Sequence, residues 1–217
     1  MKDTIYNASD LEPEKNSDTQ LIYREVVTGI GNIKSGEDMY YVKRRFLKGY
    51  EVEVASYHIL EGSDLELPGC RFIPRYGITF TDVQKDAINL DEYLRDVEKY
   101  QELDMELLKD SVATKILVGD HDIETRNFIM YPEDGRIAPV DFELSGGTDK
   151  DKRMELKARD IIRKTDADFS YGDVLEEAKE MYRKIDTDGA FERIESNGLY
   201  TPEVKEMREY MDGRFGS

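Results

Sequence analysis

The chain has 217 residues, of which 48 are acidic and 31 are basic, so its formal net charge is −17. This charge repels phosphate backbones and anionic lipid headgroups, which argues against binding to nucleic acid or to a membrane surface. A single cysteine, Cys70, excludes an intramolecular disulfide, and no apolar run approaches the ~18 residues of a transmembrane helix. We therefore expect a cytoplasmic protein whose thiol stays reduced.

The first part of the chain is rich in β-branched and aromatic residues. Residues 20–27 and 39–46 predict an antiparallel pair of strands, separated by a Gly-containing connection from 28 to 38. Apolar residues then recur at intervals of three and four, which predicts a helix over 50–60. Residues 71–83 predict a further segment of sheet.

The second part of the chain has mainly helical patterns. Asn89 is suited to cap the start of a helix. Further helices are expected at about 102–117, 150–164 and 173–185. This order predicts an α+β protein with a small antiparallel-sheet lobe that carries one helix at residues 1–86, and a mainly helical lobe at residues 87–217.

The most informative segment lies inside the second part. Asn127 follows Asp122 by five residues, and Asp141-Phe142-Glu143 begins fourteen residues after Asn127. The residues between them predict a hairpin, with strand, turn and strand at 128–131, 132–135 and 136–140. At about 3.3 Å per residue, the hairpin returns Asp141 close to Asn127, so that one divalent cation could contact both.

This spacing resembles that of the protein-kinase-like superfamily, in which a catalytic-loop Asp, an Asn and the Asp of a D-F-G element serve phosphoryl transfer. Gly119, three residues before Asp122, is similar to the catalytic loop of HipA-type and phosphatidylinositol-kinase-like enzymes. Asp141-Phe142-Glu143 is similar to the corresponding element of aminoglycoside phosphotransferases. The resemblance implies a two-lobed kinase-like fold that uses ATP and Mg²⁺, with Asp122 as the catalytic residue and Asn127 and Asp141 as Mg²⁺ ligands.

A different alignment of the same loop would make Asp120 the catalytic carboxylate. Asp120 precedes Asn127 by seven residues rather than five, so Asp122 fits the spacing better. His121, between two carboxylates, could relay a proton or serve as an oriented structural residue.

Kinase-like folds hold the nucleotide phosphates with a strand lysine that pairs with an acidic residue of the following helix. Lys43, in the otherwise apolar run Tyr40-Tyr41-Val42-Lys43, matches the lysine. Glu53 is its expected partner and Glu51 is the alternative. Residues two apart lie about 200° apart around a helix, so only one of the two can face the strand.

The loop that would cover the phosphates has two possible registers. Gly29-Ile30-Gly31 contains G-x-G but lacks the third glycine of the full motif. Residues 15–19 instead offer Ser17 and Thr19, whose hydroxyls, together with backbone N–H groups, could contact phosphate. We favour the second register.

A third local resemblance lies further along the chain. Residues 155–160, Glu-Leu-Lys-Ala-Arg-Asp, resemble a run in the small kinase of the KEOPS tRNA-modification complex. That resemblance implies that Asp160 braces the catalytic loop, whereas the alternative is a solvated helix face.

These observations predict an ATP- and Mg²⁺-dependent phosphotransferase that transfers the γ-phosphate to a hydroxyl. HipA-type resemblance implies a protein acceptor, whereas aminoglycoside-phosphotransferase resemblance implies a cationic small molecule. The alternative is a nucleotide-binding pseudokinase, because the glycine motif is incomplete and only 74 residues follow Glu143. A third hypothesis, from the charge alone, is an acidic interaction protein without a nucleotide site.

Overall fold

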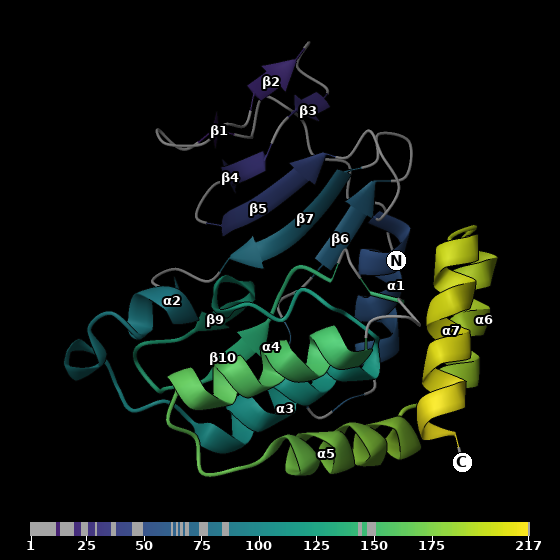
Figure 1. The fold of residues 1–217 in the computed structure, drawn as a ribbon. Helices are drawn as coiled ribbons and strands as arrows, with labels where there is room; N and C mark the ends of the chain where they lie inside the picture. Colours follow the sequence, from purple (N-terminus) through teal and green to yellow (C-terminus); the bar gives the residue numbers. More distant parts are fainter. Residues whose placement is uncertain are drawn as a thin grey trace. The chain divides into compact units, whose positions relative to one another are not determined.

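The computed structural model describes residues 12–13, 20–22, 26–28, 30–35, 38–44, 50–61, 63, 65, 67, 70–73, 78–83, 87–142, 145–146 and 151–216 (Figure 1). By their internal contacts, the residues divide into two compact units. Unit 1 combines Met1–Tyr50 with Pro68–Lys85, and unit 2 combines Glu51–Leu67 with Asp86–Ser217.

Unit 1 contains a five-stranded sheet in the order β1-β4-β5-β7-β6, in which every neighbouring pair is antiparallel. Its strands are Glu12–Pro13 (β1), Ile30–Ser35 (β4), Asp38–Arg44 (β5), Cys70–Ile73 (β6) and Ile78–Val83 (β7). Lys43 lies in the central strand, β5, where its backbone is opposite Ile30 on one side and Thr79 on the other.

The predicted pairing of residues 20–27 with 39–46 is wrong. Residues 20–28 instead contain β2 (Gln20–Ile22) and β3 (Val26–Thr28), which pair with each other in a separate two-stranded sheet. Strand β5 pairs with β7 on one side and on the other with β4, which lies inside the stretch that we expected to be a connection. The sequence of β4 lacks a regular alternation of apolar and polar residues, so its pairing with β5 decides its conformation.

Unit 2 is mainly helical. Its helices are Tyr50–Leu60 (α1, whose first residue belongs to unit 1), Leu90–Tyr93 (α2), Met105–Leu117 (α3), Asp151–Lys164 (α4), Tyr171–Lys184 (α5), Thr187–Ser196 (α6) and Pro202–Phe215 (α7). The expected helices at 50–60, 102–117, 150–164 and 173–185 are confirmed within three residues at each end. Asn89 caps α2 by accepting from the N–H of Glu92 at 2.9 Å, as expected.

Two helices, α6 and α7, were not expected, although both carry ordinary start signals. Asp186 accepts from the N–H of Gly189 at the start of α6. Thr201 accepts from the N–H of Val204 at the start of α7, and Pro202 occupies its first turn. The capping residues of this segment therefore already indicated where the two helices begin.

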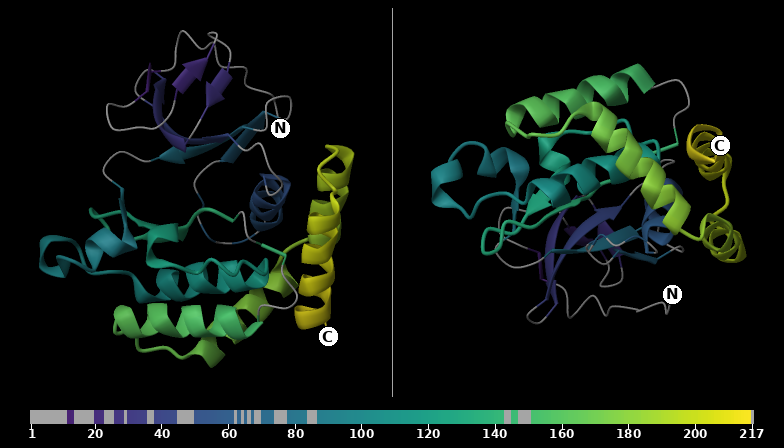
Figure 2. Two further views of the ribbon diagram at one scale, coloured as in Figure 1. Left: turned by 45° about the horizontal axis from the view of Figure 1, so that its top comes forward. Right: turned by 90° about the horizontal axis from the view of Figure 1, so that it is seen from below.

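The centre of unit 2 is α3, which packs against both α5 and the hairpin strand β10. Leu108, Val112 and Ile116 of this helix are completely buried. Figure 2 shows α3, α4 and α5 side by side, and α5 also contacts α4 and α7. No helix among the described residues is long and apolar enough to cross a membrane.

Helix α1 packs in unit 2, whereas the sequence placed it with the sheet in residues 1–86. Residues 52–60 are all buried, which explains why its sequence lacks a polar face. The ring of Tyr57 meets Phe142 edge-on, with centroids 5.2 Å apart. The hydroxyl of Ser56 lies 3.3 Å from that of Ser145 and 3.7 Å from the sulfur of Met207.

Candidate functional site

The candidate catalytic loop begins at a sharp turn after α3. Gly119 has φ +69°, and the N–H of Asp120 donates to the carbonyl of Lys115 at 2.8 Å. A Cβ at position 119 would lie 2.9 Å from Cδ1 of Tyr210, which is shorter than any normal contact. Glycine is therefore required here for both its backbone conformation and its small size.

Asp122 is held by three hydrogen bonds within this loop. Its own N–H donates to Oδ1 of Asp120 at 2.9 Å. The side-chain Nδ2 of Asn127 donates to the carbonyl and to Oδ2 of Asp122, both at 2.9 Å. The Asp122 side chain remains 13% exposed, so its carboxylate is both oriented and accessible.

A short hairpin connects Asn127 with Asp141, as predicted. Strand β9 (Phe128–Met130) pairs with β10 (Ile137–Pro139) in antiparallel register, and β8 (Ile88–Asn89) completes a three-stranded sheet. The N–H of Val140 donates to the carbonyl of Asn127 at 2.9 Å. This bond holds the backbone just before Asp141 beside that of Asn127.

Asp141 has an unusual backbone conformation, with φ +60°. A non-glycine residue adopts this left-handed region at a cost of about 1–2 kcal/mol. In this conformation Asp141 as a residue stays partly exposed, although its Oδ1 is buried, while Phe142 next to it is completely buried. Glu143 lies outside the described residues.

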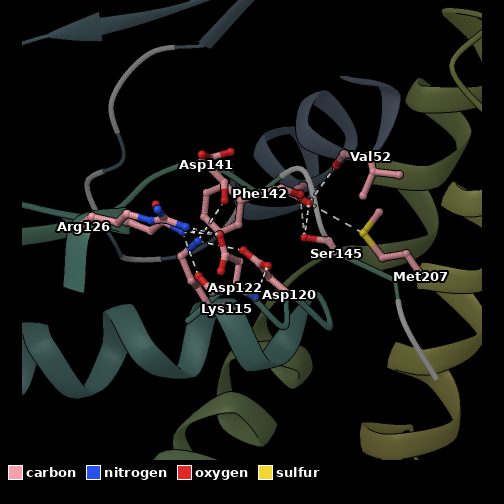
Figure 3. Close-up of polar contacts among 11 residues, drawn as sticks. Val52, Lys115, Asp120, Asp122, Arg126, Asp141, Phe142, Ser145 and Met207 are labelled. Atoms are coloured by element: carbon pink, nitrogen blue, oxygen red, sulfur yellow. Dashed lines mark hydrogen bonds and ion pairs between the residues drawn. The ribbon is translucent and has the colours of Figure 1, made fainter. Parts of the chain in front are cut away.

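A buried cation that we did not expect from the sequence lies beneath this site. Lys115, on α3, donates from Nζ to Oδ2 of Asp120 at 2.7 Å and to the carbonyl of Asp141 at 3.0 Å (Figure 3). Lys115 and Asp120 are both 0% exposed. A lysine among the buried apolar positions of α3 was the available signal.

The burial of Asp120 also bears on the choice between the two loop alignments. Both of its oxygens are engaged, one by Lys115 and the other by the N–H of Asp122. Asp120 is therefore closed to an acceptor molecule, whereas Asp122 is not.

Basic side chains lie close to the loop despite the acidic composition of the chain. Arg126, 64% exposed, has its Nη2 3.7 Å from Oδ2 of Asp122 and 3.1 Å from Oε2 of Glu124. Lys157 of α4 donates to Glu124, and this hydrogen bond lowers the pKa of that carboxyl group. Helix α4 is thus tethered to the candidate catalytic loop through Lys157.

The prediction that Asp160 braces the catalytic loop is wrong for the described residues. Its carboxylate pairs with Arg163 at 2.5 Å and with Lys164 at 2.8 Å, both on its own helix. These neighbours lower the pKa of Asp160, with Lys164 contributing most. Asp160 follows Lys157 by three residues, so its side chain leaves α4 about 60° away from that of Lys157.

The donors at Asn127 and Asp141 suit Mg²⁺. Among the residues that the structure describes, no group of three or more His, Cys, Asp or Glu side chains could enclose a metal ion. Magnesium, however, is usually held by one or two carboxylates together with water and the phosphates of a substrate. Both side-chain hydrogen bonds of Asn127 use Nδ2, so its Oδ1 can act as a metal ligand, as can the carboxylate of Asp141.

The residues expected to bind the nucleotide are only partly described. Lys43 belongs to unit 1, and Glu53 and Glu51 belong to unit 2, so their pairing stays a prediction. Glu53 is 1% exposed, whereas Glu51 is partly exposed. Ser17 and Thr19 lie outside the described residues. Gly31, from the other possible phosphate loop, is a strand residue opposite Val42.

No protein-family model matches the chain, and no curated protein matches it either. Among solved structures, the chain is similar to the Helicobacter pylori proinflammatory kinase CtkA, with a TM-score of 0.56, 13% identity and coverage of 92% of this chain and 94% of that chain. Two weaker similarities are to the choline kinase LicA of Streptococcus pneumoniae and to a complex of Neurospora crassa PAN2 with PAN3 (pseudokinase and C-terminal part).

The LicA match has a TM-score of 0.38, 13% identity and coverage of 83% of this chain and 90% of that chain. The PAN2–PAN3 match has a TM-score of 0.31, 11% identity and coverage of 95% of this chain and 53% of that chain. Neither score is high enough to support an argument about the fold. The similarity to CtkA shows that this chain, mixed α and β and mostly helical, has a protein-kinase-like fold.

Proposed function

We propose that this protein is an ATP- and Mg²⁺-dependent phosphotransferase that transfers the γ-phosphate to a hydroxyl group. The observation that carries the proposal is the state of Asp122: a partly exposed carboxylate, fixed by the amide of Asn127 and by the backbone bond to Asp120. A carboxylate held in this way is suited to orient an acceptor hydroxyl and to take up its proton.

In the proposed reaction the acceptor oxygen attacks the γ-phosphorus, and the bond from that phosphorus to the β,γ-bridging oxygen breaks. ADP leaves with the bonding electrons, and the hydroxyl proton passes to Asp122. Mg²⁺, when bound, neutralises charge on the phosphate oxygens. Asn127 and Asp141 would hold the metal ion.

The remaining nucleotide contacts are proposed from the resemblance. Lys43 would bind the α- and β-phosphates and would be kept extended by Glu53 or by Glu51. Ser17 and Thr19 would cover the phosphates. The acceptor would be a hydroxyl of a protein or of a cationic small molecule, and the net charge of −17 favours an acceptor that carries positive charge.

A pseudokinase is the second candidate, because Gly31 lies in strand β4 rather than in a glycine-rich phosphate loop. Such a protein would bind Mg²⁺–nucleotide but would transfer no phosphate. It would still need Asp141 and Asn127, but Asp122 would have no chemical role.

The test uses wild-type protein, Asp122→Asn and a matched control, Asp168→Asn, in which an exposed carboxylate outside the site is changed. Transfer from labelled ATP is measured with the protein itself, with basic Ser-, Thr- and Tyr-containing peptides, and with aminoglycosides as acceptors. Binding of Mg²⁺ with a non-hydrolysable ATP analogue is measured by calorimetry.

We expect Asp122→Asn to lower the transfer rate by about 10²–10⁴-fold while nucleotide affinity changes little. The asparagine can still accept from Asn127, so the loop should persist. Transfer by Asp122→Asn at the wild-type rate would contradict the proposal. Binding without transfer in the wild type would favour the pseudokinase, and absence of nucleotide binding would exclude both.

A further inference from the structure

A continuous chain of hydrogen bonds joins the catalytic loop to the loop that carries Asp141. The N–H of Asp122 donates to Asp120 at 2.9 Å, Lys115 donates to the other Asp120 oxygen at 2.7 Å, and Lys115 also donates to the carbonyl of Asp141 at 3.0 Å. Figure 3 shows these residues gathered at one point above α3. Asp122 and Asp141, which are 19 positions apart in the sequence, are thereby connected through the ammonium group of Lys115.

The surroundings of this ammonium group fix its position. Its third N–H has no carboxylate or carbonyl partner among the described residues, and the ring centroid of Phe142 lies 4.8 Å from Nζ. A cation at this distance from an aromatic ring is attracted to it. The ring of Phe142 is held in turn by Tyr57 of α1.

Stability alone does not account for this arrangement. A buried ion pair loses the hydration of both charges, and replacing such a pair by neutral residues is often neutral or stabilising. The Lys115–Asp120 pair is completely buried. It does, however, supply a donor to a carbonyl whose residue has a strained, left-handed backbone, which an apolar side chain could not do.

We propose that Lys115 is a positioning residue that fixes the positions of Asp122 and Asp141 relative to each other. The roles of these two carboxylates rest on the proposed function. The coupling of the two loops, however, can be measured without any enzymatic activity. Lys115 acts through Asp120 on the catalytic loop and directly on the backbone of Asp141.

The first test measures the coupling by nuclear magnetic resonance. Asp120→Asn alters a residue that is linked to Asp141 through Lys115, and it weakens the hold on Lys115 by removing its counter-charge. The double variant Lys115→Met/Asp120→Asn removes both charges together and should fold even if the single variant does not. The control, Val174→Ala, removes buried methyl groups from α5, away from the site.

The carbonyl carbon of Asp141 and the amide of Phe142 belong to one peptide unit. We expect their resonances to shift in the double variant, and also in Asp120→Asn if that variant folds. In Val174→Ala these signals should stay in place. Unchanged Asp141 and Phe142 signals in the double variant would overturn the proposal, whether or not the protein proves to be an enzyme.

The second test measures Mn²⁺ affinity in the presence of a non-hydrolysable ATP analogue. Loss of a residue that positions a metal ligand typically costs 10–100-fold in metal affinity, so we expect a rise of about tenfold or more in the Mn²⁺ dissociation constant of the double variant. A purely structural role would lower the thermal midpoint and leave this constant unchanged, as expected for Val174→Ala, and that result would overturn the proposal.

The two tests also separate this inference from the proposed function. If the wild type binds Mn²⁺–nucleotide without transferring phosphate, the proposed transfer fails but the affinity test still decides the role of Lys115. If the wild type binds no nucleotide, the proposed function fails, and the resonance shifts of Asp141 and Phe142 alone decide whether Lys115 couples the loops.

Discussion

The side-chain amide of Asn127 donates to both the carbonyl and Oδ2 of Asp122, at 2.9 Å each, so one residue orients the carboxylate and closes its loop. We predict that Asn127→Ala lowers kcat/KM for transfer by about 10²-fold or more and raises the Mg²⁺ concentration needed for half-maximal rate. Steady-state kinetics at several Mg²⁺ concentrations measure both effects. The control Asn197→Ala changes an exposed asparagine after α6. An unaltered Mg²⁺ requirement in Asn127→Ala would exclude Asn127 as a ligand.

Gly119→Ala should destabilise the protein by about 2–4 kcal/mol, because the alanine must adopt a left-handed backbone and its Cβ would press on the ring of Tyr210. Gly213→Ala is a matched control. Gly213 lies on the exposed side of helix α7, and a Cβ there meets nothing within 4 Å, so alanine should stabilise by about 0.5–1 kcal/mol. Denaturant unfolding compares the two variants. Equal stabilities would show that the turn at Gly119 is not as described.

Lys157→Met should raise the pKa of Glu124, because the hydrogen bond from Lys157 is the main cause of its lowered value. The ion pair is partly exposed, so the free energy of unfolding should change by less than about 1 kcal/mol. Carbon-detected titration of the Glu124 carboxyl measures the effect. Asp160→Asn is the control, since the ion pairs of Asp160 lie within α4. If the pKa of Glu124 rose in the control but not in Lys157→Met, Lys157 would not be the cause of its lowered value.

Asp110→Asn should stabilise the protein at pH 8 and have a smaller effect towards pH 4. Burial, with a contribution from Glu177, raises the pKa of Asp110 to about 6. The unfolded value is near 3.9, so the folded state binds the proton more tightly. This contribution to stability is fully present below about pH 4 and is lost as the pH rises through about 6.

The shift corresponds to nearly 3 kcal/mol, which we reduce to about 1–2 kcal/mol because Asp110 is only half-buried. Unfolding in urea at pH 8, 6 and 4.5 measures the difference between Asp110→Asn and the wild type. Asp96→Asn, at an exposed carboxylate with no cap hydrogen bond, is the control. An effect of Asp110→Asn that is independent of pH would contradict the prediction.

The elements predicted correctly from the sequence are those whose patterns are local. Helices α3, α4 and α5 were expected at about 102–117, 150–164 and 173–185, and the β9–β10 hairpin follows from two short apolar runs around a Gly-containing turn. Strand β4 was missed because its conformation depends on pairing with β5. Helices α6 and α7 were missed although their caps, at Asp186 and Thr201, are recognisable in the sequence.

The sequence by itself determined the spacing of Asp122, Asn127 and Asp141 and the hairpin between the last two, because neighbouring residues along the chain decide these features. Only the tertiary structure decided that Lys115 is a buried cation shared by two loops, and that Lys157 rather than Asp160 reaches the candidate catalytic loop. The physical reason is that burial and ion pairing depend on which elements pack together. Distant segments such as α3, α4 and the Asp141 loop meet only in the folded chain.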